Sequence, residues 1–193
     1  MPPHKHQELL TAAIEHEAEA QRDLLGGHLE TARAEFAAAA ELYRQSWEAA
    51  HAKAFGRLVG MLKAAVLAGG DAASESQYAR EALAGADRDS PTANYARAIA
   101  ALIAGDDGDA EAWAARLAGA PDAFARTGEA ISALAAHDEA RYAAALAAIV
   151  RDFEQRAEHL TGVAIADTAL MLEALAGRRG MAAGLESPVL PAL

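Results

Sequence analysis

The sequence contains no cysteine. This absence excludes disulfide bridges, cysteine nucleophiles, iron–sulfur clusters and thiolate zinc sites. Segments that alternate apolar and polar residues are almost absent, and no Asn-Gly or Asp-Gly turn joins two such segments, so β-hairpins are not expected. Aromatic residues make up only 5% of the chain. The core must therefore be built mainly from small and aliphatic side chains.

Long apolar runs are also missing. The longest nearly uncharged run, around Tyr142–Val150, has about ten residues, whereas a membrane-spanning helix needs about 20. At the N-terminus, Met1–His6 is followed directly by an amphipathic pattern, without the apolar core of a signal peptide. We therefore expect a cytoplasmic protein that has no membrane partner.

Basic residues are too few and too scattered to form a nucleic-acid interface. Lys and Arg number 17 against 28 Asp and Glu, which gives a formal net charge of -11. The acidic excess is spread evenly along the chain, and no basic stripe is available to neutralise phosphates. Nucleic acid is therefore not expected as a partner. An evenly acidic surface is typical of a solvated protein, and it would also attract a basic partner.

Helical periodicity extends along nearly the whole chain. Alanine, the strongest helix former, is the commonest residue, and Gly, Pro, Asp and Ser mark the breaks. The pattern predicts an all-α protein of about nine helices in one domain, 1–193. The clearest start signal is Ser90-Pro91, a capping serine before a proline at the first helical position. Ser46 is expected to cap a long third helix that runs to about Ala68, and the ninth helix is expected from about Val163.

The helices are expected to pair into stacked αα-hairpins. Four turns share an apolar end, a Gly, Asp or His turn, and a helix that starts with small or polar residues. Successive turns lie about 43, 35 and 32 residues apart, within the range of two-helix repeats. The predicted hairpins cover residues 8–44, 47–84, 91–118 and 122–158, and a capping helix with a tail covers 163–193. Stacking would give the pairs a continuous core that one pair cannot form alone.

One of these turns carries a recognisable spacing. Gly27, Ala32, Phe36 and Ala39 match the second half of a tetratricopeptide repeat, which this segment resembles. Two further segments keep the same spacing with other residues. The first contains Gly105, Ala110, Ala114 and Leu117, and the second contains His137, Tyr142, Leu146 and Ile149. The chain departs from the family because the preceding helices lack its Trp, Leu-Gly and Tyr positions, and no proline ends a repeat. The resemblance implies a right-handed solenoid that binds a protein or peptide.

The last seventy or so residues carry a second resemblance. Leu134–Asp138, Asp152–Glu154 and the closing Leu185–Pro191 are similar to the C-terminal part of alanine-rich helical proteins. These include a family of predicted immunity proteins from bacterial polymorphic toxin systems. This resemblance implies a protein that binds and blocks one cognate toxin and catalyses no reaction.

The sequence carries no complete catalytic or cofactor motif. Gly177–Gly180 follows a helix, whereas a phosphate loop precedes one, and its two arginines suit a helix C-terminus. No Gly-x-Ser-x-Gly motif is present. Glu48 and His51 form a single Glu-x-x-His motif, whereas a di-iron bundle needs two such motifs and two more carboxylates. We therefore expect no catalytic residue, no metal and no cofactor.

Trp47 and Tyr78 are the aromatic residues that are hardest to assign to the core, and they are candidates for contact with a partner. The leading hypothesis is a non-catalytic helical-repeat module that binds another protein or peptide. One alternative is an immunity protein that neutralises a cognate toxin. A second is a small-ligand or metal-binding helical bundle, with an enzyme as one form of it. An open end of the repeat stack could also form a homodimer.

Overall fold

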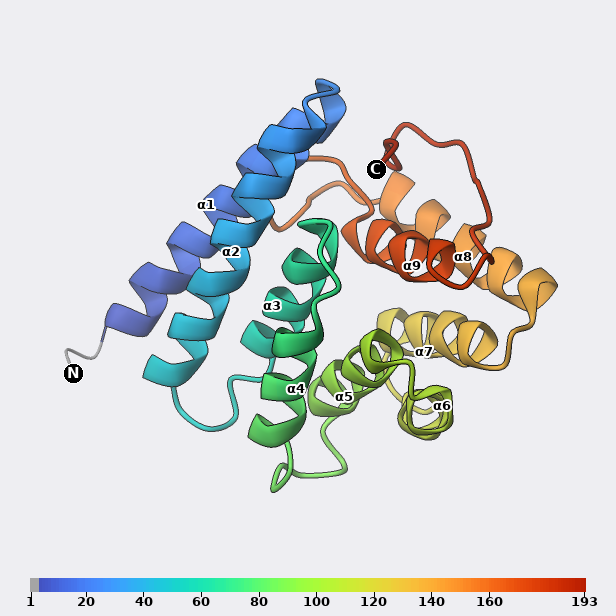
Figure 1. The fold of residues 1–193 in the computed structure, drawn as a ribbon, viewed down its shortest axis with the longest axis horizontal. Coiled ribbons are helices and arrows are strands. Elements are labelled where there is room, and N and C mark those ends of the chain that lie inside the picture. Colours follow the sequence, from blue (N-terminus) through green and yellow to red (C-terminus); the bar gives the residue numbers. More distant parts are fainter. Residues whose placement is uncertain (1–3) are drawn as a thin grey trace.

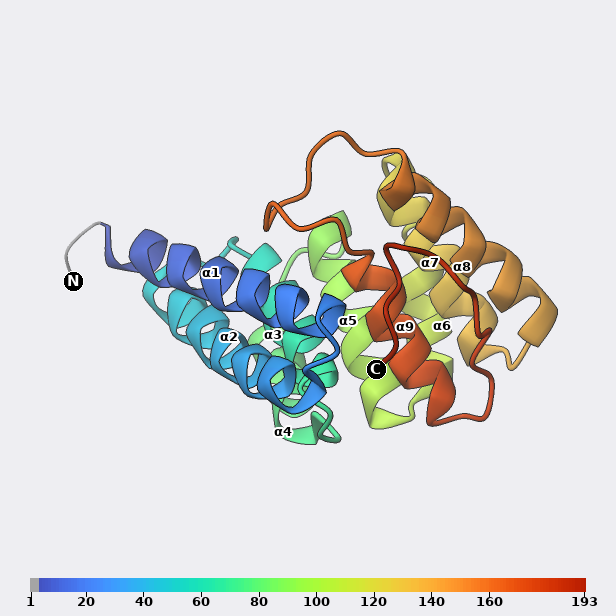
Figure 2. The ribbon, with the colours of Figure 1, turned by 90° about the horizontal axis from the view of Figure 1, so that it is seen from above.

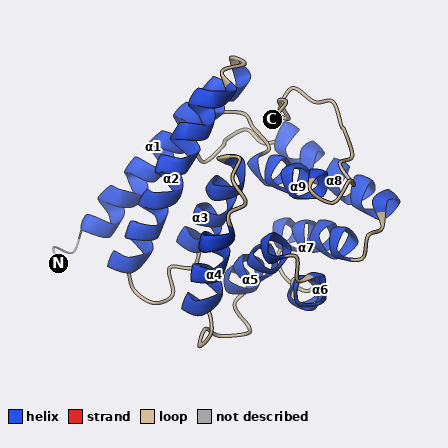
Figure 3. Ribbon diagram, in the orientation of Figure 1, coloured by secondary structure: helices blue, strands red, loops and turns tan. Residues whose placement is uncertain are grey.

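The computed structural model describes residues 4–193, which contain nine helices (Figures 1 and 3). In chain order these are α1 (Lys5–Leu25), α2 (Leu29–Ala49), α3 (Gly56–Leu67), α4 (Ala73–Ala82), α5 (Pro91–Ala104), α6 (Asp107–Ala115), α7 (Asp122–Ala135), α8 (Glu139–Glu154) and α9 (Asp167–Gly177). The only β pairing within residues 4–193 is an isolated bridge between Ser187 and Leu190. The prediction of an all-α fold is confirmed.

None of the helices described here qualifies as a membrane span. Among the described residues, none of them combines the length and the apolar character that a bilayer span requires. Met1–Pro3, which form part of the N-terminal segment used above to argue against a signal peptide, lie outside the described residues.

Short polar side chains start several helices. The Ser90 hydroxyl accepts a hydrogen bond from the backbone N–H of Ala93 at 3.3 Å, and Pro91 occupies the first position of α5. Asp106 and Asp138 accept in the same way from the first turns of α6 and α8. These oxygens satisfy N–H groups that have no partner within their own helix. The start signal predicted at Ser90-Pro91 is confirmed.

The second and third helices divide at a different place from the predicted one. Ser46 lies inside α2, and α3 begins only at Gly56. The buried Ser46 hydroxyl donates a hydrogen bond to the backbone oxygen of His6 at 2.6 Å. A contact with α1 thus occupies the side chain that was expected to cap a helix. The predicted long third helix is wrong, and residues 47–49 belong to α2, not to a second hairpin covering 47–84.

The ninth helix also starts later than expected. Residues 155–166 form an irregular segment, called here the 155–166 loop, and α9 begins at Asp167 instead of Val163. The loop reaches α1, where the Thr161 hydroxyl donates a hydrogen bond to the side-chain oxygen of Gln21 at 2.5 Å. Gly162 has a φ of 71°, a conformation that glycine adopts without strain.

Each helix packs against the next along the chain, and the odd-numbered helices make additional contacts. Helix α3 contacts α5, α5 contacts α7, and α7 contacts α9. Helix α9 also contacts α3, so these four helices form a closed ring of contacts (Figures 1 and 2). The long pair α1 and α2 lies along the outside of α3 (Figure 1).

Helix α5 is the most deeply buried element of the ring. Every residue from Ala93 to Leu102 is buried. A helix that is buried on all sides belongs to the interior of a protein, and its many alanines let neighbouring helices approach closely. The alanine-rich composition therefore serves close helix packing, as the scarcity of aromatic residues suggested.

The C-terminal tail lies on the surface of the helices in an extended form (Figure 2). Val189 is buried, and its carbonyl oxygen accepts a hydrogen bond from the backbone N–H of Ala166 at 2.7 Å. The Glu173 carboxylate on α9 accepts from the backbone N–H groups of Ala183 and Gly184, both at 3.0 Å. The tail therefore lies against α9 and the segment just before it.

Gly128 is expected to be indispensable where α7 meets α6. A Cβ atom there would lie 2.9 Å from the backbone oxygen of Ala114 and 2.9 Å from the Cβ of Leu117. Because a backbone oxygen cannot turn aside, Gly128→Ala should lower the free energy of unfolding by about 1–3 kcal/mol. Gly108→Ala is the matched control, since a Cβ meets nothing there and alanine favours the helix by about 0.5–1 kcal/mol.

Urea unfolding followed by circular dichroism measures both changes. A Gly128→Ala protein that is as stable as the original would contradict the close approach of α6 and α7.

Candidate functional site

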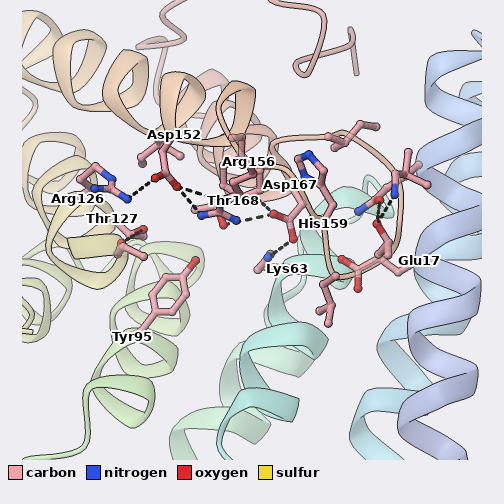
Figure 4. A pocket seen from close by; sticks show the side chains of 18 of the residues that line it. Glu17, Lys63, Tyr95, Arg126, Thr127, Asp152, Arg156, His159, Asp167 and Thr168 are labelled. Atoms are coloured by element: carbon pink, nitrogen blue, oxygen red, sulfur yellow. Dashed lines mark hydrogen bonds and ion pairs between the residues drawn. The ribbon is translucent and has the colours of Figure 1, made fainter. Parts of the chain in front are cut away.

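A cavity of about 270 Å³ lies between α1, the ring helices, α8 and the 155–166 loop. It is called here the central cavity, and its lining includes Glu17, Lys63, Tyr95, Arg126 and Asp152. Figure 4 shows these side chains arranged across the space between α1 on one side and α7 on the other. Three larger hollows on the described part of the chain, of about 540, 530 and 300 Å³, contain no buried charged side chain. The central cavity is therefore the better candidate for a functional site.

Lys63 and Asp167 form an ion pair at one wall of the cavity. Their side chains are only 14% and 15% exposed, and they join the middle of α3 to the first residue of α9. Burial lowers the pKa of Lys63, but the charge of Asp167, assisted by Tyr95 and Glu17, outweighs burial and raises that pKa above its ordinary value. The Lys63 ammonium group therefore stays charged, and its pairing offsets the cost of removing it from water.

Glu17 brings a second carboxyl group to the same wall. It is 4% exposed, and it accepts a hydrogen bond from the Tyr43 hydroxyl at 2.6 Å. Burial raises the pKa of Glu17 above its ordinary value, with the charge of Lys63 acting in the opposite direction. Burial and the neighbouring Glu17 also raise the pKa of Tyr43. Glu17 therefore gives up its proton less readily than an ordinary glutamate does.

Two buried polar atoms of the cavity lining have no hydrogen-bond partner. They are the Tyr95 hydroxyl oxygen and the His159 Nδ1, and they are the only such side-chain atoms in the described part of the chain. The Thr168 hydroxyl lies beside Tyr95, but the two do not meet the geometry of a hydrogen bond. A buried polar group without a partner costs about 1–3 kcal/mol. Both atoms belong to residues that line the cavity, and neither has its hydrogen bond satisfied within the described residues.

The opposite end of the cavity carries an excess of positive charge. Asp152 on α8 accepts from Arg126 at 2.7 Å and from Arg156 at 2.6 and 3.1 Å. One carboxylate is thus shared by two guanidinium groups, which leaves one net positive charge. These side chains are about one-third exposed, and Arg156 also lies 3.7 Å from the centre of the Phe153 ring. This cluster forms the more accessible end of the cavity.

The 155–166 loop covers part of the cavity. Its His159 ring stacks on Phe153 with centres 6.1 Å apart, and Thr161 bonds to Gln21 as described above. Leu160 also lines the cavity, yet its side chain is 78% exposed. A large apolar side chain in this position would contact an occupant at the entrance.

The structure places both predicted partner-contact residues outside the central cavity. Trp47 is half-buried and stacks on Phe55 with ring centres 5.8 Å apart. Tyr78 is also half-buried, and its hydroxyl donates to Glu48 at 3.2 Å. Neither residue lines the cavity, and neither is brought close to the polar groups described above.

The single Glu-x-x-His motif is not assembled into a metal site. Glu48 accepts from Tyr78, and His51 is exposed beyond the end of α2. Within residues 4–193, no group of three or more His, Cys, Asp or Glu side chains could hold a metal ion.

Sequence reasoning missed the cavity residues, although two of them carried a signal. Glu17 lies on the stripe of α1 that otherwise contains Ala13, Ala20 and Leu24, all buried. Lys63 is the only charged residue between Leu58 and Leu67. A charged residue on an apolar face or within an apolar helix needs a partner, and this requirement pointed to a buried polar site.

The chain matches no protein-family model, no curated protein and no solved structure in the three comparisons. The resemblances to tetratricopeptide repeats and to immunity proteins therefore stay predictions. The function is therefore inferred from the cavity.

Glu17→Gln is expected to stabilise the protein at neutral pH. Because the pKa of Glu17 is higher in the folded state than its ordinary value of 4.5, its ionisation costs stability as the pH rises from 4.5 through the raised value. Glutamine keeps an acceptor for the Tyr43 hydroxyl without the charge. The melting temperature of the variant should equal that of the original at about pH 4, and exceed it by about 2–4 °C at pH 8.

Glu15→Gln is the matched control, because Glu15 is exposed on the same helix. It should show no such pH-dependent difference. A Glu17→Gln variant that melts below the original at pH 8 would show that ionised Glu17 stabilises the fold.

Proposed function

We propose that this chain is a helical binding protein that takes a small polar ligand in the central cavity. The observation that carries this proposal is the pair of unpartnered buried atoms, the Tyr95 hydroxyl and the His159 Nδ1, whose residues line one and the same cavity. Buried polar atoms in folded proteins are nearly always hydrogen-bonded, and each exception calls for an explanation. A ligand that completes both hydrogen bonds would recover the cost of leaving them unsatisfied.

The size and lining of the cavity define the class of ligand. Sites for drug-sized molecules usually enclose about 300–1,000 Å³. A cavity of about 270 Å³ therefore suits a smaller molecule. Polar groups on the ligand would meet Tyr95 and His159, while Phe124 and Ile149 offer apolar contact.

Binding without catalysis agrees with the state of Lys63. A group that transfers protons at neutral pH works best with a pKa near 7. The pKa of Lys63 is raised, which moves it away from that range, and its ammonium group is held by Asp167. These groups therefore favour orienting a ligand over transferring its protons.

A small ligand is favoured over the protein partner that the resemblances implied. Only three large hydrophobic residues are exposed in the described part of the chain, and they are Leu25, Leu160 and Leu193. Interfaces normally depend on a cluster of apolar or aromatic anchors. We therefore rank binding of a peptide, or of a cognate toxin, below binding of a small ligand. A right-handed tetratricopeptide-like stack remains our proposal for the hairpins, supported by the successive contacts of α3, α5 and α7.

Tyr95→Phe is expected to separate binding from stability. Ligand-observed NMR with a library of soluble fragments small enough for the cavity will identify binders, whose affinities are then measured by titration. Removal of the Tyr95 hydroxyl should weaken these binders about tenfold, the equivalent of one hydrogen bond worth about 1.4 kcal/mol. The melting temperature should stay the same or rise, because the hydroxyl that is lost has no partner in the protein.

Tyr78→Phe provides the control, since its hydroxyl bonds to Glu48 outside the cavity. This variant should bind fragments as the original does. The proposal fails if no fragment binds, or if the fragments that bind are insensitive to Tyr95→Phe.

A further inference from the structure

A separate hollow of about 180 Å³ lies on the outer side of α4, α5 and α6. It is called here the tryptophan–arginine pocket, and its lining includes Arg80, Arg88, Arg97, Asp109 and Trp113. It shares no residue with the central cavity. What it binds is therefore independent of the function proposed above.

Arg97 gives the pocket a buried positive charge. It is only 7% exposed, and its guanidinium group donates to the backbone oxygens of Leu83 and Ala86 at 2.8 and 2.7 Å. The same group lies over the ring of Trp113, 4.5 Å from its centre. Its hydrogen-bond acceptors are carbonyl and amide oxygens, and no carboxylate within residues 4–193 forms an ion pair with it. Buried charges in proteins are usually paired, so this cation lacks the usual compensation.

Two more arginines approach the same ring. The guanidinium carbons of Arg88 and Arg116 lie 5.9 and 5.7 Å from the ring centre of Trp113. Within residues 4–193 neither side chain makes a hydrogen bond or an ion pair. After burial, the charges of these two arginines are what lowers the pKa of Arg97. Three like charges therefore surround one aromatic ring and repel one another.

The carboxylates nearby do not balance this charge. Asp109 lines the pocket, but Arg80 already contacts it at 3.3 Å and also contacts Asp106 at 3.2 Å. Asp87 also acts on the pKa of Arg97 and raises it, but its effect is the smallest of those that shift this pKa. The local excess of positive charge is notable in a chain whose net charge is -11. An anion from outside the chain would supply the missing negative charge.

We propose that the tryptophan–arginine pocket binds a phosphate group. Arg88 lines the pocket and has free N–H groups, and a phosphate has enough oxygen atoms to accept from more than one guanidinium group. A phosphate monoester carries a charge of about −1.5 to −2 at pH 7, so it balances more of the local positive charge than a carboxylate does. Arg97 is fixed by its bonds to backbone oxygens, so it contributes a positioned charge, while Arg88 reaches the anion. Arg116 lies beside the same ring but does not line the pocket. The pocket volume suits the phosphate of a small molecule or inorganic phosphate itself.

Trp113 provides a reporter for this site. The chain has two tryptophans, so a Trp47→Phe background leaves Trp113 as the only source of tryptophan fluorescence. Iodide, an anionic quencher, should quench Trp113 strongly, and added inorganic phosphate should protect it in a saturable way at ionic strength held constant with potassium chloride. Arg88→Gln should weaken the protection by phosphate about tenfold, the usual range for a hydrogen bond between charged groups.

Arg151→Gln is the matched control, because Arg151 is exposed on α8 and lies outside the pocket. Its protection by phosphate should equal that of the parent. Glycerol 3-phosphate is tested in parallel, and protection by either compound supports recognition of a phosphate group. Which of the two binds more tightly distinguishes a phosphomonoester from free phosphate.

Two results would overturn the proposal. One is chloride protecting Trp113 as well as phosphate does, which would mean an adventitious ion only. The other is protection by phosphate that is the same in the Arg88→Gln and Arg151→Gln variants. If the Trp47→Phe protein does not fold, calorimetric titration of inorganic phosphate into the original chain and the same two arginine variants distinguishes the same outcomes.

Discussion

The ion pair between Lys63 and Asp167 joins two segments that are 104 residues apart in the sequence. It fixes the first turn of α9 against α3 and thereby closes the ring of odd-numbered helices. Elements on either side of α9 depend on this placement, because the 155–166 loop ends at it and the tail bonds back to Ala166 just before it. Breaking one partner of such a pair typically costs about 3–5 kcal/mol, since the other charge stays buried without compensation.

A polar centre is a costly choice for an alanine-rich helical protein. Replacing a buried ion pair by apolar residues of similar volume often leaves the stability of a protein unchanged or raises it. Here the ion pair stands beside Glu17, whose pKa is raised by burial, and beside the unpartnered Tyr95 hydroxyl. Glu17 and the Tyr95 hydroxyl each lower the stability of the protein. Their convergence on one cavity is what distinguishes a site from an accident of packing.

Local signals made the helices predictable, whereas long-range partners did not. The cap at Ser90 and the turn at Gly105 act within a few residues, so the sequence shows them directly. Ser46 has equally suitable chemistry for a cap, but its hydroxyl bonds to α1, 40 residues away. Glu17 and Lys63 are charged residues among apolar neighbours, and the sequence alone shows this. Which residues they meet depends on how the hairpins rotate on one another, and helix periodicity does not determine this rotation.

The closure of the ring by α9 has a consequence for the order in which the chain can fold during its synthesis. Helices α1 to α8 can pair with their neighbours as they leave the ribosome, because those contacts are mainly local. Lys63, however, pairs with Asp167, which is made more than 100 residues later. The central cavity is therefore the last part of the protein to reach its native form, and its wall at Lys63 stays open to water until α9 packs against α3.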